Sequence, residues 1–276
     1  MKIRNIILFL FVFCALSQCK KEPEEPYSNE HIILDNAQAA LFFHVIFREA
    51  ENAWAFIHEK NYESGTYHDP ENKPNVTKSY TYNVATNDVT INYNAWPSNN
   101  LLLVGTLRVG FRVDSYRIDG SVANVYLSEF SIDGNDIRGV PSIKRSSDNK
   151  YTYNFIDGAV YERGVNMPVL ITGKIENGQY ERIEGGDTFT QDDDVWAYSG
   201  TMTGMLHDNP KLNYTNKVLT SYIFENGDNG VIHFTMDKNC LTAKKGVSEI
   251  TIKDRPDITF GYFCTDIKFI SVEHVR

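Results

Sequence analysis

The sequence predicts a mainly β protein in which one N-terminal amphipathic helix packs on an antiparallel β-sandwich-like fold. Apolar residues recur every three to four positions over one early stretch, and short runs that alternate apolar with polar residues follow Asn61. Gly, Asn and Asp separate these runs. Because no later stretch has the helical period, the crossover helices of a parallel sheet are missing, and we expect antiparallel pairing in a two-layer domain.

The helix is expected to cover about 25 residues from Asp35, which can cap it with Gln38 at the third helical position. Its apolar side carries Phe43, Ile46, Phe47, Ala50, Trp54 and Ile57. Its other side carries His44, Arg48, Glu51 and Glu59. We expect the aromatic-rich side to pack on the strands, with a membrane surface or a partner protein as the alternative contact.

Several runs have the two-residue period of a half-buried strand. The inward positions are expected to be Leu107, Val109, Phe111 and Val113 in one run, then Tyr151, Tyr153 and Phe155, then Val169, Ile171 and Ile175, and then Ile232, Phe234 and Met236. Hairpin turns are expected at Asp119-Gly120, Asn177-Gly178 and Asn226-Gly227, because both residues of such pairs tolerate positive φ.

Two short aromatic runs, Val89 to Tyr93 and Ile258 to Tyr262, resemble one another. The segment from Lys144 to Lys150 is charged and polar. The β-rich domain, residues 35–276, is therefore expected either to contain two related halves that meet near residue 145 or to repeat an ordinary strand pattern by chance.

The N-terminus has the pattern of an export signal. Lys2 and Arg4 precede an apolar run that is too short to span a bilayer, and Leu16-Ser17-Gln18 precedes Cys19. This pattern resembles the lipobox of bacterial lipoproteins, which implies removal of residues 1–18 and a lipid on Cys19. Residues 19–34 would then be a flexible tether, since Lys20 to Asn29 is polar and rich in proline.

The charge of the chain argues against nucleic acid as a partner. The formal net charge is −9, and removal of residues 1–18 would take Lys2 and Arg4 away and leave −11. A basic surface for phosphate is therefore not expected. A hydrophobic content of 42% can fill a sizeable core, which excludes a globally disordered chain.

Cys240 and Cys264 remain after Cys14 leaves with the signal and Cys19 takes a lipid. An exported protein permits them to form a disulfide, which would close a loop of roughly 25 residues. Two buried thiols are the alternative. Zinc is not expected, because there is no CxxC motif and no histidine at ligand spacing.

Motifs for catalysis are missing from the sequence. There is no HExxH zinc helix, no GxSxG nucleophile elbow and no phosphate-binding GxxxxGK[ST] loop. No catalytic residue, metal ligand or cofactor is predicted. A pair of carboxylates, as glycoside hydrolases use, remains as an enzymatic alternative that the sequence does not locate.

The aromatic residues are the candidates for ligand binding. Tyr93 with Trp96, and Trp196 with Tyr198, stand in loop-like settings beside Pro97 and the acidic triplet that begins at Asp192. Rings on a β scaffold can stack on sugars. A place in the β core is the alternative for all four residues.

Four segments carry a broader resemblance: Leu107 to Gly110, Gly120 to Val122, Glu129 to Gly134, and Ile258 to Cys264. They are similar to elements of uncharacterised Bacteroidetes outer-membrane lipoproteins, over residues 35–276. The D-[FY]-G core of the last element and the cysteines of the first copy are missing here. The resemblance implies the fold and an outer-membrane location, with surface display expected from the lysines and acids after Cys19 and a periplasm-facing anchor as the alternative. It implies no activity.

Together these features predict a lipid-anchored envelope protein that acts as a non-catalytic binding or assembly module. The expected partner is a glycan or another envelope protein, besides the membrane through the lipid on Cys19. A carboxylate-based glycoside hydrolase and a purely structural envelope protein are the alternatives.

Overall fold

A computed structural model describes residues 28–61, 63–98, 101–111, 120–147, 149–162, 168–185, 194–225, 245–263 and 272–273. The chain divides into two compact units, Met1–Ile32 and Ile33–Arg276. The predicted signal, the lipid site Cys19 and the predicted disulfide between Cys240 and Cys264 lie outside the described residues.

Helix α2 spans Asn29–Glu59 and begins six residues before the predicted start at Asp35. Ser28 acts as its N-cap, since the Ser28 hydroxyl accepts a hydrogen bond from the backbone N–H of His31 at 3.3 Å. The predicted cap at Asp35 is therefore wrong, and residues 29–34 belong to the helix rather than to a tether. Among the described helices, none is both long and apolar enough to cross a membrane.

The described strands form one antiparallel sheet of 14 strands. They are β1 (Gly65–His68), β2 (Thr77–Asn83), β3 (Asp88–Ser98), β4 (Leu101–Phe111), β5 (Val122–Ile132), β6 (Asn135–Ser147), β7 (Lys150–Tyr161), β8 (Val169–Glu184), β9 (Val195–Ser199), β10 (Thr201–Leu206), β11 (Asn213–Glu225), β12 (Lys245–Ile252), β13 (Ile258–Phe263) and β14 (Val272–Glu273). Strands follow one another in chain order, except that β9 and β10 both pair with β8 and β11. A short 3-10 helix, Pro210–Leu212, precedes β11.

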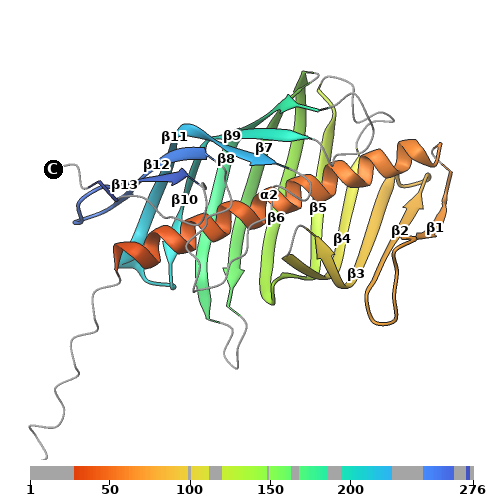
Figure 1. Cartoon of the computed structure of the whole chain (residues 1–276), viewed down its shortest axis with the longest axis horizontal. Helices are drawn as coiled ribbons and strands as arrows, with labels where there is room; N and C mark the ends of the chain where they lie inside the picture. Colours follow the sequence, from red (N-terminus) through yellow and green to blue (C-terminus); the bar gives the residue numbers. More distant parts are fainter. Residues whose placement is uncertain are drawn as a thin grey trace, which may run out of the picture. The chain divides into compact units, whose positions relative to one another are not determined.

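Helix α2 crosses the strands and covers one face of the sheet, which we name the inner face (Figure 1). The ring of Phe43 contacts that of Phe155 in β7 at 4.3 Å, and the ring of Phe47 stacks on Tyr180 in β8 at 4.0 Å. The predicted mainly β fold, with an N-terminal helix packed on an antiparallel sheet, is confirmed. The helix itself forms the second layer.

The alternating pattern identified the inward side of several strands correctly. Leu107, Val109 and Phe111 are buried in β4, as are Tyr151, Tyr153 and Phe155 in β7, and Ile171 and Ile175 in β8. Val113, Ile232, Phe234 and Met236 lie outside the described residues.

The turn predictions were less successful. Asn177-Gly178 does not form a hairpin but lies within β8, where Asn177 has a φ of 55° and the pairing with β7 shifts register. A two-residue hairpin turn instead joins β5 to β6 at Asp133-Gly134, whose φ values are 50° and 79°. The other two predicted turns include residues outside the described part. The predicted boundary near residue 145 falls within β6.

The polar side of the predicted helix is not exposed to solvent. His44, Arg48 and Glu51 are all buried, and Glu59 alone of the four predicted polar residues is exposed. Charged side chains are almost never buried without partners. The residues around these buried charged side chains are therefore expected to include their polar partners.

Candidate functional site

The four predicted ligand-binding aromatics lie in strands and are buried. Tyr93 and Trp96 in β3 are 4% and 8% exposed, and Trp196 and Tyr198 in β9 are 0% and 6% exposed. Their predicted placement in loops is wrong. In β3 the left-handed residue Ala95 (φ 50°) shifts the pairing with β4 between Tyr93 and Trp96, so the strand continues through Pro97.

The rings of Tyr93 and Trp96 face a cation of the chain itself. Nζ of Lys78 in β2 lies 5.4 Å from the centre of the Tyr93 ring and 5.9 Å from that of Trp96. It also lies 5.0 Å from the centre of the Tyr80 ring. These distances are those of cation–π contacts. Three rings thus surround the ammonium group of Lys78.

Glu49 of α2 is the counter-ion of this lysine. Lys78 Nζ lies 3.3 Å from Oε2 of Glu49, and the Tyr93 hydroxyl donates to the same oxygen at 2.7 Å. Arg48 Nη2 lies 3.2 Å from the other oxygen, Oε1, and donates to Ser98 Oγ at 2.5 Å. We name Arg48, Glu49, Lys78, Tyr93 and Ser98 the Glu49 cluster.

The electrostatics of the Glu49 cluster hold its carboxylate in the ionised form. Burial by itself would raise the pKa of Glu49, but the charges of Lys78 and Arg48 and the hydrogen bond from Tyr93 lower this pKa to about 2. The pKa of Lys78 is raised, because the Glu49 carboxylate outweighs the effect of burial. A carboxylate that is only 1% exposed and fixed by two cations is a poor proton acceptor. The cluster therefore links α2 to β2 and β3.

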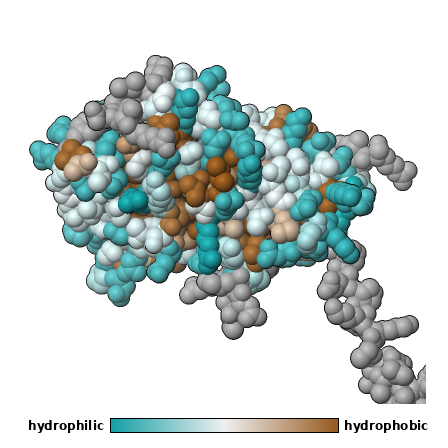
Figure 2. Space-filling model, turned by 180° about the vertical axis from the view of Figure 1, so that it is seen from behind, coloured by the Kyte–Doolittle hydropathy of each residue, from teal (hydrophilic) through white to brown (hydrophobic). Residues whose placement is uncertain are grey.

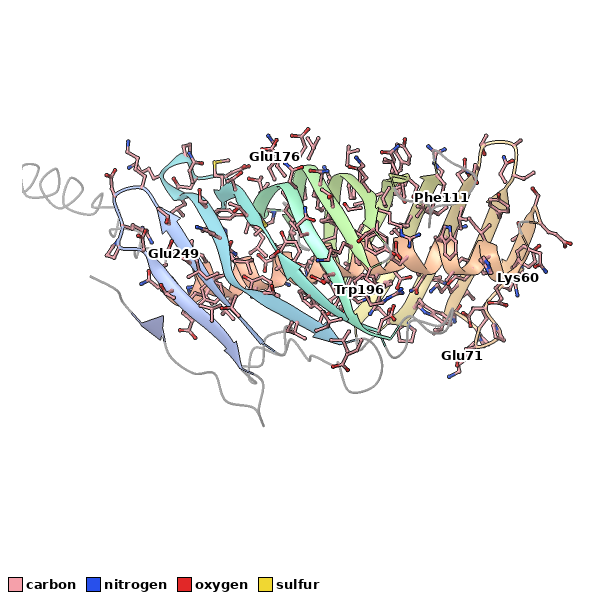
Figure 3. The ribbon with its side chains drawn as sticks, turned by 90° about the horizontal axis from the view of Figure 1, so that it is seen from above. Lys60, Glu71, Phe111, Glu176, Trp196 and Glu249 are labelled. Atoms are coloured by element: carbon pink, nitrogen blue, oxygen red, sulfur yellow. The ribbon has the colours of Figure 1, made fainter. Side chains whose placement is uncertain are left out.

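Trp196 and Tyr198 belong to the aromatic core. The Trp196 ring contacts Phe47 at 4.9 Å, and the Tyr198 ring contacts Tyr180 at 4.9 Å. Trp196 lies on the side of α2, whereas Glu176 projects from the opposite face of the sheet (Figure 3). Trp196 and Tyr198 are thus not brought together with Tyr93 and Trp96 in one site.

Three buried carboxylates of the described chain lie against basic side chains. Besides Glu49, Asp194 pairs with Arg182 at 3.6 Å, and Asp35 contacts Nε2 of His207 at 3.2 Å. A glycosidase needs two carboxylates that face each other across the bond, whereas each of these three carboxylates faces a basic side chain. In the described residues, no group of three or more His, Cys, Asp and Glu side chains is arranged to hold a metal ion.

Three of the exposed large hydrophobic residues lie on the outer face, away from α2, on consecutive strands. Tyr126 in β5 is 45% exposed, Val140 in β6 is 51% and Ile156 in β7 is 49% exposed. Val140 and Ile156 are directly paired across the strands. We name these three residues the outer-face patch. Hydrophobic atoms gather in the middle of this face (Figure 2).

Basic side chains lie beside the outer-face patch. The guanidinium of Arg108 lies 4.6 Å from the centre of the Tyr126 ring, and these two residues are cross-strand partners. Arg138, two residues from Val140, lies 4.4 Å from the centre of the Tyr161 ring. Lys174 in β8 pairs with Glu176 at 2.7 Å.

Rows of threonine side chains lie on the outer face on both sides of the patch. Thr66, Thr81 and Thr90 are successive partners on β1, β2 and β3, and Thr90 is paired with Arg108. Thr203, Thr215 and Thr251 are successive partners on β10, β11 and β12. Rows of threonine thus lie on both sides of the patch.

The sequence analysis missed the outer-face patch, although one signal was present. Ile156 follows Phe155 directly, so one of the two must point outward in a strand. Tyr126 follows Val125 directly and gave the same signal, whereas Val140 stands between Gly139 and Pro141 and gave none.

Comparison with known proteins gave no match to a family model, to a curated protein or to a solved structure. The resemblance to Bacteroidetes lipoproteins therefore stays a prediction.

Proposed function

We propose that this chain is a non-catalytic binding and assembly module whose partner is a protein that contacts the outer-face patch. The observation that carries the proposal is the placement of three exposed hydrophobic residues on consecutive strands, two of which are directly paired. Exposed hydrophobic residues scattered singly are common, but contiguous ones mark interaction surfaces.

The surroundings of the patch favour a protein over a glycan. Arginine and tyrosine are enriched at protein interfaces, and Arg108 with Tyr126 supplies both beside Val140 and Ile156. A sugar stacks on a free ring face, but Arg108 lies over the Tyr126 ring. The four aromatics predicted to bind glycans are buried.

The proposal includes the location that the sequence predicts. A lipid on Cys19 would hold the domain at the outer membrane, where its partner would be another envelope protein. We propose display on the cell surface, and a periplasm-facing anchor is the alternative.

The first test compares two sets of threonine substitutions in the full-length protein. Tyr126→Thr, Val140→Thr and Ile156→Thr together remove the patch and keep residues that favour strands. Val84→Thr with Leu219→Thr is the matched control, since these residues are 58% and 49% exposed and lie elsewhere. Chemical crosslinking on intact cells should yield a protein adduct with the wild type and the control but not with the triple variant.

Adducts of equal yield from all three proteins would contradict the proposal. A parallel thermal-shift screen of the three purified proteins against polysaccharides separates the two partner classes. A rise in melting temperature that the triple variant loses would assign a glycan, not a protein, to the outer-face patch.

A further inference from the structure

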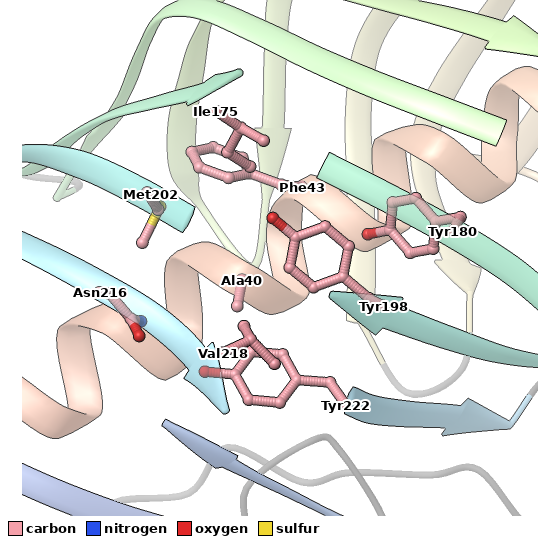
Figure 4. A pocket seen from close by; sticks show the side chains of 9 residues that line it. All are labelled: Ala40, Phe43, Ile175, Tyr180, Tyr198, Met202, Asn216, Val218 and Tyr222. Carbon is pink, nitrogen blue, oxygen red and sulfur yellow. The ribbon is translucent and has the colours of Figure 1, made fainter. Parts of the chain in front are cut away.

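A small cavity lies between α2 and the inner face, away from the outer-face patch and the Glu49 cluster. Its volume is about 10 Å³. It is lined by Ala40 and Phe43 of α2 and by Ile175, Tyr180, Tyr198, Met202, Asn216, Val218 and Tyr222 of the sheet (Figure 4).

Asn216 brings an unsatisfied hydrogen-bond acceptor to this cavity. The residue is 2% exposed, and its amide Nδ2 donates to Oδ1 of Asn36 on α2 at 3.3 Å. Its own Oδ1 is buried and accepts no hydrogen bond from the described residues. A buried polar atom without a partner is costly, and ordered water is the usual way in which proteins satisfy it.

Two glycines of β8 let residues of the cavity lining approach the strand backbone closely. A Cβ on Gly173 would come within 3.1 Å of the Phe43 ring and 3.0 Å of the Met202 sulfur. A Cβ on Gly178 would come within 3.0 Å of the Tyr198 ring. The lining residues Phe43, Met202 and Tyr198 thus pack closely against the strand backbone at these glycines.

We propose that the cavity is a binding site for one water molecule, which donates a hydrogen bond to Oδ1 of Asn216. A volume of about 10 Å³ is at the lower limit for one water and excludes larger ligands. No lining residue is charged, which favours a neutral donor over an ammonium ion. Tyr180 and Tyr198 belong to the same lining, and their hydroxyl groups can be further partners.

This water would extend the contact between Asn36 and Asn216 and so help to join α2 to β11. The inference does not depend on the proposed function, because the outer-face patch and the cavity lie on opposite faces of the sheet.

Water–protein nuclear Overhauser effects in the full-length protein test the proposal. The methyl groups of Ile175 and Met202, which are 3% and 5% exposed, should show cross-peaks to a long-lived water. The methyl groups of Ile132, which is fully buried elsewhere, are the internal control.

Two variants should abolish the cavity cross-peaks by different means. Asn216→Leu removes the acceptor and fills the space with a side chain of similar size, whereas Ala40→Val fills it and keeps Asn216. Missing cross-peaks at Ile175 and Met202 in the wild type would overturn the proposal. Cross-peaks of unchanged intensity in either folded variant would do so as well.

Discussion

At the scale of single residues, Lys78 and Glu49 form a pair whose two members are not equivalent. Glu49 is the carboxylate that contacts both buried cations, Arg48 and Lys78. Lys78 places the end of its side chain among three rings, where an uncharged chain of similar length can also pack. Removal of one partner from a buried ion pair leaves an uncompensated charge, and the cost depends on which partner goes.

We therefore expect Glu49→Gln to be far more damaging than Lys78→Met. The first variant leaves two buried cations without a counter-charge and should lower the free energy of unfolding by about 3–5 kcal/mol. The second leaves Glu49 paired with Arg48 and fills the ring cage with a thioether. Urea denaturation of the two variants measures the difference, and an equal or reversed order would contradict this account of the cluster.

His44 is a second buried group that titrates abnormally. Its ring stacks on Phe224 with centres 3.9 Å apart, and Nδ1 has no hydrogen-bond partner in the described chain. Burial, with a smaller effect from Arg48, holds the pKa of His44 well below its usual 6.5. The folded state thus keeps this imidazole neutral at pH values where the unfolded chain takes up a proton.

Stability should consequently fall as the pH decreases through two ranges. Below pH 6.5 the unfolded chain binds a proton at His44, whereas His44 in the folded protein stays neutral. Between pH 4.5 and about 2 the same holds for Glu49. For both groups, the folded protein reaches its full stability only at pH values above the pKa that the group has in the unfolded chain.

The variant His44→Phe isolates the first range, because it keeps a ring on Phe224. At pH 5.5 the wild type should have lost about 1.4 kcal/mol relative to this variant, compared with their difference at pH 7.5. Denaturation curves at the two pH values measure this change, and an unchanged difference between the proteins would rule out a neutral His44.

At the scale of elements, polar contacts hold both ends of α2 and rings hold its middle. Asp35 contacts His207 and Asn36 contacts Asn216 near one end, and Glu49 contacts Lys78 towards the other. Between them, the rings of Phe43 and Phe47 pack on β7 and β8. Polar pairs of this kind can fix the register of a helix on a sheet, because a shift of the helix would leave each buried polar group without its partner.

The packing of α2 also depends on a glycine of β8, where the missing side chain lets the helix approach the strand. Gly173→Ala would press a methyl group against Phe43 and Met202, and we expect a loss of about 1–3 kcal/mol. Gly110→Ala is the matched control on β4, since its Cβ would approach only the Tyr126 ring, at 3.8 Å. Thermal unfolding should separate the two variants, and similar melting temperatures would show that the helix does not rest tightly on β8.

Sequence patterns identified the helix and several strands well, but they predicted the tertiary contacts of single residues poorly. The helix and the inward residues of β4 and β7 followed from local periodicity, which depends on neighbours in the chain. The burial of Arg48 did not follow from this periodicity, because one of its partners, Ser98, lies on β3, 50 residues further along the sequence. Trp96 was misplaced because Pro97, which follows a shift in strand pairing, is typical of loops.

At the scale of the whole domain, the sheet has one face that packs α2 and one that carries the outer-face patch. No local pattern could show that all described strands join one sheet, since strand order depends on pairing between distant segments. The patch should add little to stability because its side chains are half-exposed. We expect the triple threonine variant to unfold within about 1.5 kcal/mol of the wild type, at roughly 0.5 kcal/mol per site.

Measured melting temperatures check this expectation and decide whether the variant is usable in binding assays. A loss of several kcal/mol would mean that the patch belongs to the core of the fold.

The most direct test of the central claim is site-specific photocrosslinking on intact cells that make the full-length protein. A photoreactive amino acid at Ile156 should form an adduct with one discrete protein, and the same amino acid at Val84 should not. An adduct at Ile156 that disappears when Tyr126 and Val140 are also changed to threonine would agree with docking on the outer-face patch. No adduct at Ile156, or the same adduct from both positions, would contradict it.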